Sequence, residues 1–294
     1  MAPRRALDLA ALALLTLIWG TTWAAIRVAV RGVPPLTGVA MRFALAGILL
    51  LAVARLQRVP LGRAPHERQL WATNALLTFA GSYGIVFWAE QWVPSGLSSV
   101  LFATFPLWTV LLAPLLLPGE RLGWRAAAGV GLGFLGVGLI FSRDLAPGGG
   151  RAALAAAVFL LAPLLSAVAN LLTKRFGAGV HPLSLTAVPM LLGALLVAPV
   201  AVASEDLRRA AFDRASLIAL VYLAAVGSAL AFTVYYWLLR RITVVASSMV
   251  TYTAPVVAVA IGALFLDERL GPHTLLGAAL VLAGVVLTVW RRAE

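Results

Sequence analysis

The sequence predicts an all-α integral membrane protein of ten transmembrane helices, arranged as two inverted repeats of five helices. Three observations lead to this fold class. The chain is 62% hydrophobic and 12% charged, a composition foreign to soluble domains. Apolar stretches of about 20 residues, the length that crosses a bilayer, recur throughout the 294 residues. One sequence pattern also occurs twice, once in each half of the chain.

The repeated pattern joins a serine pair, a proline in mid-span and a charged turn. Its first copy holds Ser98-Ser99, Pro106 and Glu120-Arg121-Leu122, and its second holds Ser247-Ser248, Pro255 and Glu268-Arg269-Leu270. The prolines are 149 residues apart and the glutamates 148, so the register is kept to within one residue. Each copy predicts a helix with a mid-span proline, a short turn and a second, glycine-rich helix.

The predicted spans are 9–30, 35–54, 70–89, 94–117, 124–141, 152–174, 183–203, 217–239, 243–265 and 273–290. A glycine-rich linker at 143–151 separates a first repeat, 1–142, from a second, 152–294. Five spans is an odd number, so the second repeat enters the membrane upside down relative to the first. The glycine-rich fifth and tenth spans are expected to pack closely on each other.

The basic residues lie between the apolar runs and favour one side of the membrane. Most of them fall in the segments that are cytoplasmic if the N-terminus is cytoplasmic, so both termini are predicted there. The net charge of +12 is therefore assigned to membrane orientation, and no nucleic-acid partner is expected. The sequence contains no cysteine, which excludes disulfides and thiolate metal sites. A monomer in the lipid bilayer is expected.

The opening of the chain resembles a known family. The motifs that carry the resemblance are Trp19-Gly20-Thr21-Thr22-Trp23, Val33-Pro34-Pro35 and Arg42-Phe43, followed by the two proline-to-Glu-Arg-Leu patterns. In this order they resemble the EamA-type drug/metabolite transporters (the DMT superfamily). The resemblance covers essentially the whole chain. It implies a ten-helix carrier of the bacterial inner membrane, with two inverted five-helix repeats around a central cavity. Members of the family export amino acids, other metabolites or drugs, and one branch exports aromatic amino acids.

Candidate substrate-binding residues are the aromatic side chains that recur on single helix faces and the few polar residues within spans. They are Trp19, Trp23, Tyr83, Phe87, Ser99, Phe102, Asn170, Tyr235, Ser248 and Tyr252. The alternative for the aromatic residues is an interfacial belt or simple packing. The serines can equally bond back to their own helix.

Candidate gating residues are Arg42, Glu90, Pro106 and Pro255. Each proline removes a backbone donor and is expected to kink its helix. Arg42 is an ionisable residue within a span, and such residues are functional candidates. It is expected either to extend toward the interface or to pair with Glu90, which lies at the outer end of the third span and would then act as a latch.

The predicted function is secondary transport by alternating access, without cofactor or metal. Because carboxylates are confined to loops and span ends, facilitated export is favoured over its alternative, proton-coupled efflux of drugs or metabolites. The competing class is a lipid-modifying membrane enzyme. Such enzymes need clustered acids, histidine pairs or a nucleophile with a base, whereas the three histidines here are scattered over loops.

Overall fold

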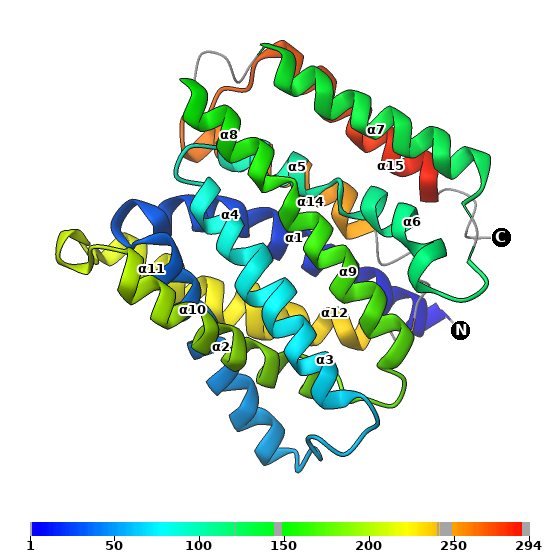
Figure 1. The fold of residues 1–294 in the computed structure, drawn as a ribbon, viewed down its shortest axis with the longest axis vertical. Coiled ribbons are helices and arrows are strands. Elements are labelled where there is room, and N and C mark those ends of the chain that lie inside the picture. The colour runs from blue at the N-terminus through cyan, green and yellow to red at the C-terminus, as the bar shows by residue number, and fades with distance from the viewer. Residues whose placement is uncertain (1, 121, 144–148, 240, 242–248, 290–294) are drawn as a thin grey trace.

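The computed structural model describes residues 2–120, 122–143, 149–239, 241 and 249–289, and every regular element in these ranges is helical (Figure 1). The elements of the first half are α1 (Ala2–Gly32), α2 (Pro35–Leu56), α3 (Glu67–Thr73), η1 (Asn74–Ser82), α4 (Tyr83–Ala89), α5 (Ser95–Phe102), α6 (Phe105–Leu116) and α7 (Trp124–Arg143).

The second half follows a similar order: α8 and α9 together take the place of α1, the short helix η2 is added, and α14 is the described counterpart of α5 and α6. Its elements are α8 (Gly149–Phe159), α9 (Leu161–Phe176), α10 (Ser184–Ser204), η2 (Leu207–Arg209), α11 (Arg214–Ala224), η3 (Ala225–Leu230), α12 (Ala231–Leu239), α14 (Met249–Phe265) and α15 (Pro272–Val289). Eight helical stretches in the described ranges are long and apolar enough to cross a membrane, and Thr253–Phe265 and Pro272–Thr288 are shorter apolar helices. The chain is thus a multi-pass, all-α membrane protein, as predicted.

Contacts between the two halves come in matched pairs. If elements are counted from the start of each half, α7 packs on its counterpart α15, and α2 packs on its counterpart α10 (Figure 1). Two further pairs of contacts exchange roles between the halves: α1 packs on α14 as α9 packs on α6, and α1 packs on α11 as α9 packs on η1. Each helix therefore contacts the other half much as its counterpart does.

The predicted pairing of the fifth and tenth spans is confirmed, because α7 and α15 have the most extensive contact among the described elements. Glycines set the separation of the two helices. A Cβ built on Gly136 would lie 2.5 Å from the carbonyl oxygen of Gly277, and one on Gly129 would lie 2.5 Å from that of Gly284. No side chain fits at these points, so the two backbones are in direct contact.

The two repeated prolines act differently. Pro106 is the second residue of α6, and the preceding helix α5 ends at Phe102, four residues earlier. Proline has no backbone N–H to donate to the carbonyl four residues earlier, but it is tolerated in the first turn of a helix. At Pro106 the helix is therefore interrupted, where the sequence predicted only a kink. Pro255 instead lies inside α14, which runs from Met249 to Phe265 without interruption.

Both predicted third and eighth spans contain a π-helical segment. η1 separates α3 from α4, and η3 separates α11 from α12. π-helical turns are rare and occur mostly at functional sites. Nothing in the periodicity of the sequence predicts them. Phe79 belongs to η1, and Gly227 and Ser228 belong to η3.

Candidate functional site

The helix α1 links two groups of aromatic rings. Trp19 contacts Phe232 and Tyr235, with ring centroids 5.7 and 5.2 Å apart. One turn later, Trp23 lies with its ring centroid 5.5 Å from that of Phe102 and 6.2 Å from that of Phe159. The spacing of four residues places both indoles on the same side of α1, where they meet helices of both halves.

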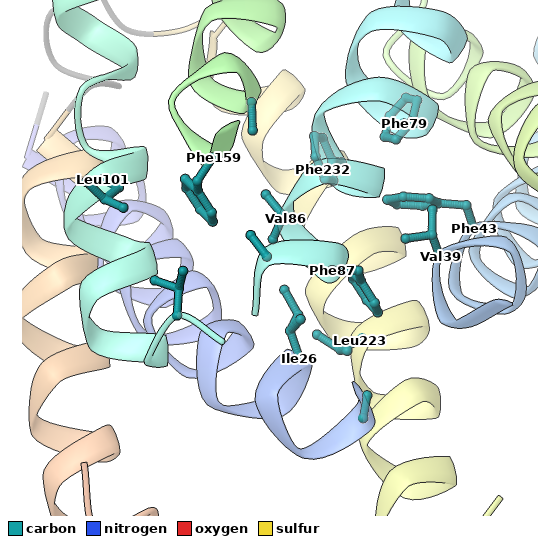
Figure 2. Packing of buried hydrophobic residues seen from close by; sticks show 14 of the residues in the cluster. Ile26, Val39, Phe43, Phe79, Val86, Phe87, Leu101, Phe159, Leu223 and Phe232 are labelled. Atoms are coloured by element: carbon teal, nitrogen blue, oxygen red, sulfur yellow. The ribbon is translucent and has the colours of Figure 1, made fainter. Parts of the chain in front are cut away.

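The group around Trp19 extends to the other side of the bundle. Phe79 lies 5.6 Å from Phe232 and 5.0 Å from Phe43 between ring centroids, and Tyr83 lies 5.0 Å from Phe43. Figure 2 shows Phe43, Phe79 and Phe232 converging from α2, η1 and α12. The two groups are joined through α1, which carries both Trp19 and Trp23. We call the two groups together the aromatic cluster: Trp19, Trp23, Phe43, Phe79, Tyr83, Phe102, Phe159, Phe232 and Tyr235.

Several members of this cluster keep accessible surface although they meet other rings between the helices. Trp19, Trp23, Tyr83 and Phe102 are half-buried, whereas Phe43, Phe79 and Phe159 are fully buried. The Trp19 indole nitrogen has no hydrogen-bond partner. A buried indole N–H normally finds an acceptor, so the cluster offers both flat apolar contact and an unused donor.

Arg42 lies against this cluster with 1% of its surface exposed. Its Nε donates to the Ser228 hydroxyl at 2.9 Å, and its Nη2 reaches the Gly227 carbonyl at 3.5 Å. The guanidinium carbon lies 4.8 Å from the centroid of the Tyr83 ring, a cation–π distance. The Nη1 atom has no hydrogen-bond partner.

The π-helical segment η3 supplies the polar partners of Arg42. Both Gly227 and Ser228 belong to η3, where the wider turn leaves a carbonyl free to accept from a side chain. Gly227 also lets η3 approach α1, because a Cβ there would lie 2.7 Å from Cγ2 of Thr22. Arg42 from the first half is thus held by backbone and side chain of the second.

The expected pair between Arg42 and Glu90 is not formed in this structure, because Arg42 is turned toward η3. Glu90 is fully buried at the end of α4, and neither of its carboxyl oxygens has a hydrogen-bond partner. The Arg27 guanidinium donates to the backbone carbonyl of Glu90 instead of its carboxylate. Charge on this carboxyl is therefore unfavourable, since a buried ion needs compensating bonds.

Glu90→Gln is expected to leave the free energy of unfolding unchanged or to raise it, because the carboxyl forms no bond that the amide would lose. Thermal unfolding in detergent measures the effect. The matched control is Glu67→Gln, since buried Glu67 accepts from the Ala64 amide at 2.8 Å and from the Ser184 hydroxyl. That control should lose about 1–3 kcal/mol. A similar loss at Glu90 would mean that its carboxylate has a partner.

The other predicted site residues divide into three groups. Asn170 is near Tyr235, to whose hydroxyl its amide donates at 3.5 Å, and Phe87 lies 5.8 Å from the Arg42 guanidinium carbon. The Ser99 hydroxyl donates to the Gly96 carbonyl of its own helix at 2.6 Å, so it is used within α5. Ser248 and the side chain of Tyr252 lie outside the residues that the structure describes.

Sequence reasoning missed two glutamates that cap helices across the bundle. Glu268 accepts from the amides of Ser95 and Gly96 and from the Ser95 hydroxyl, at 2.8–3.1 Å. Glu205 accepts from the amides of Leu36 and Thr37 and from the Thr37 hydroxyl, at 2.7–2.8 Å. We call these the carboxylate caps of α5 and α2. The repeated Glu-Arg-Leu turn, which contains Glu268, was the sequence signal that could have indicated the cap on α5.

Comparison with known proteins agrees with this architecture. Residues 8–142 and 153–290 each match the EamA-like transporter family, and the two matches together cover nearly the whole chain.

The chain belongs to the EamA-like transporter family.

Named relatives of this EamA protein include exporters. It is 31% identical to a probable terminal-alkyne amino-acid exporter of Streptantibioticus cattleyicolor, over 97% of this chain and 95% of the relative. It is 27% identical to a probable amino-acid metabolite efflux pump of Escherichia coli K12, over 95% of both chains. A crystal structure with 22% identity superposes with a TM-score of 0.70 and covers 97% of this chain and 99% of that one. That last likeness concerns the fold alone.

Proposed function

We propose that this EamA protein exports small amphipathic metabolites, with amino acids as the substrate class and aromatic ones favoured. The observation that carries the proposal is the aromatic cluster with Arg42 beside it, between helices of both halves. Flat rings suit apolar and aromatic side chains, and a few polar groups fix orientation. The names of the two relatives, an amino-acid exporter and an amino-acid metabolite efflux pump, support the same substrate class.

The proposed mechanism is alternating access between two inverted five-helix repeats, residues 1–142 and 152–294, joined by the linker 143–151. The matched pairs of contacts support a twofold relation between the halves, and the two family matches divide the chain at the same place. In transporters of this design, substrate binds where the repeats meet and helices are interrupted. The interruption between α5 and α6 beside Phe102 fits that pattern.

Transport is proposed to be facilitative, in the bacterial inner membrane. Obligate proton coupling needs a carboxylate or histidine within the pathway. Glu90, which is buried directly after the last residue of α4, is a candidate for this role, and proton-coupled efflux through it is the second candidate mechanism.

Counterflow in proteoliposomes tests the function. Vesicles containing the purified protein are loaded with each of the twenty amino acids, and uptake of the same radiolabelled amino acid is followed. Accumulation above protein-free vesicles for at least one amino acid is expected, without a pH gradient. No accumulation for any of them would contradict amino-acid export. Accumulation only under an imposed pH gradient would favour the proton-coupled alternative.

Topology can be tested with reporter fusions. Reporters in loops 31–34, 142–151 and 266–272 are expected to be periplasmic, and those in loops 55–69 and 118–123 cytoplasmic. The reason is the excess of arginine in the latter segments. Alkaline phosphatase and green fluorescent protein fusions report the two sides. Finding the two Glu-Arg-Leu turns on one side would rule out inverted repeats.

Cysteines introduced at Trp23, Tyr83 and Phe102 are expected to react with a water-soluble maleimide and to be protected by the transported amino acid. The absence of native cysteine leaves no background. The matched control is Leu115→Cys, whose site on α6 is 77% exposed on the outside of the bundle. It should not react with the water-soluble maleimide, because maleimides react with the thiolate and a thiol in hydrocarbon stays protonated. Unreactive cysteines at all three cluster positions would show that substrate does not pass there.

A further inference from the structure

Arg42 keeps donor capacity that the protein does not use. A guanidinium has five N–H donors in a planar fork. The bonds to Ser228 and Gly227 use Nε and Nη2, and the buried Nη1 has no partner. A buried, unpartnered donor normally costs stability, so its retention points to a ligand that accepts from it.

The charge of Arg42 is also uncompensated. Two less buried bases of the described residues meet acids: Arg241 lies 2.7 Å from Asp8, and Lys174 lies 3.8 Å from Glu120. Arg42 is more deeply buried than these bases, yet no carboxylate of the described ranges forms an ion pair with it. A buried charge without a counter-ion is strongly unfavourable. An anionic ligand would remove that cost.

The surroundings define what kind of anion fits. The guanidinium carbon lies 5.2 Å from the Phe43 ring centroid, 4.8 Å from that of Tyr83 and 5.8 Å from that of Phe87. Phe43 lies next to Phe79, which in turn lies next to Phe232, so these rings continue the apolar surface (Figure 2). A planar carboxylate matches the guanidinium fork, and an apolar or aromatic side chain matches the rings.

We propose that Arg42 binds the carboxylate of the transported substrate, whose side chain lies against the aromatic cluster. This inference rests on the proposed export function and adds the charge that a substrate must carry. Arg42 comes from α2 and its present partners come from η3, so a carboxylate bound to Arg42 would lie beside the place where the two halves meet. Amines that lack a carboxylate would not be substrates.

The transport test compares the amino acid that gives the fastest counterflow with its own carboxamide. The wild-type protein is expected to half-saturate at concentrations roughly tenfold to a hundredfold lower for the carboxylate, the range of a charge-assisted hydrogen bond. Arg42→Gln should remove this preference, and the exposed control Arg31→Gln should keep it. An Arg42→Gln protein that folds and still prefers the carboxylate would overturn the proposal while leaving export intact.

A binding test on the wild-type protein does not depend on knowing the substrate or on the variant folding. Phenylglyoxal modifies accessible guanidinium groups, and peptide mass spectrometry reports modification at Arg42. Phenylacetate should slow modification of Arg42 at least about tenfold, since it offers a carboxylate on a ring, and phenylacetamide should not. Equal protection by both compounds, or an Arg42 that is never modified, would overturn the proposal. Protection without any amino-acid counterflow would instead contradict only the export function.

Discussion

Gly136→Leu is expected to force α7 away from α15 and to lower the free energy of unfolding by about 3 kcal/mol, the upper part of the range for overpacking. The reason is the 2.5 Å distance between a Cβ at this position and the Gly277 carbonyl oxygen, which belongs to backbone that cannot rotate away. Thermal unfolding in detergent and the yield of monodisperse protein measure the effect. Gly284→Leu, on the opposite helix, should behave in the same way.

The control lies on the same helix. A Cβ at Gly138 meets nothing within 4 Å, so Gly138→Leu adds the same side chain without a clash. Its free energy of unfolding should be at least that of the wild type, because leucine has a better helix propensity than glycine. Equal losses for Gly136→Leu and Gly138→Leu would mean that the α7–α15 contact does not set the stability of the protein.

Glu268→Ala is expected to lower the free energy of unfolding by about 2–3 kcal/mol and to lower the transport rate. It removes a carboxylate that accepts three hydrogen bonds at the first turn of α5, where an anion also interacts favourably with the helix dipole. The helix α5 carries Phe102 of the aromatic cluster, so its displacement also disturbs the proposed pathway. Denaturant titration and counterflow measure the two effects.

Two further variants test this assignment. Gly262→Ala should act in the same direction, because a Cβ there would lie 2.5 Å from Oε2 of Glu268 and displace the cap. Arg269→Ala changes the exposed neighbour in the same turn and should have little effect. If Arg269→Ala were as harmful as Glu268→Ala, the turn as a whole would matter and the carboxylate cap would not be its cause.

The distribution of hydrophobic residues was sufficient to predict the all-α membrane fold class and most of the helices. The predicted span 35–54 corresponds to α2 at Pro35–Leu56, and 124–141 corresponds to α7 at Trp124–Arg143. The glycines of α7 and α15 predicted their contact, because small residues matter only where backbones meet. These features depend on local composition, which a single sequence displays directly.

The partners of polar side chains could not be predicted in the same way. Arg42 was expected to extend outward or pair with Glu90, yet it bonds to Ser228, which is 186 residues away in sequence. The cap on α5 likewise joins residues 173 positions apart. Such partners depend on how the halves dock, and hydrophobic periodicity carries no information about that. The π-helical turns were missed as well, because the apolar composition of a span is the same whether a turn is α-helical or π-helical.

The carboxylate caps also make the first half of the chain depend on the second half for its stability. Both Glu205 and Glu268 belong to the second half, and both complete the first turn of a helix in the first half. A fragment that ends at the linker would lack both glutamates, so the first amides of α2 and α5 would lose these hydrogen-bond acceptors. Its stable form would be a complex with the other fragment. Genes for the two halves, placed on separate plasmids, should therefore yield stable protein only when they are expressed together, as an obligate heterodimer.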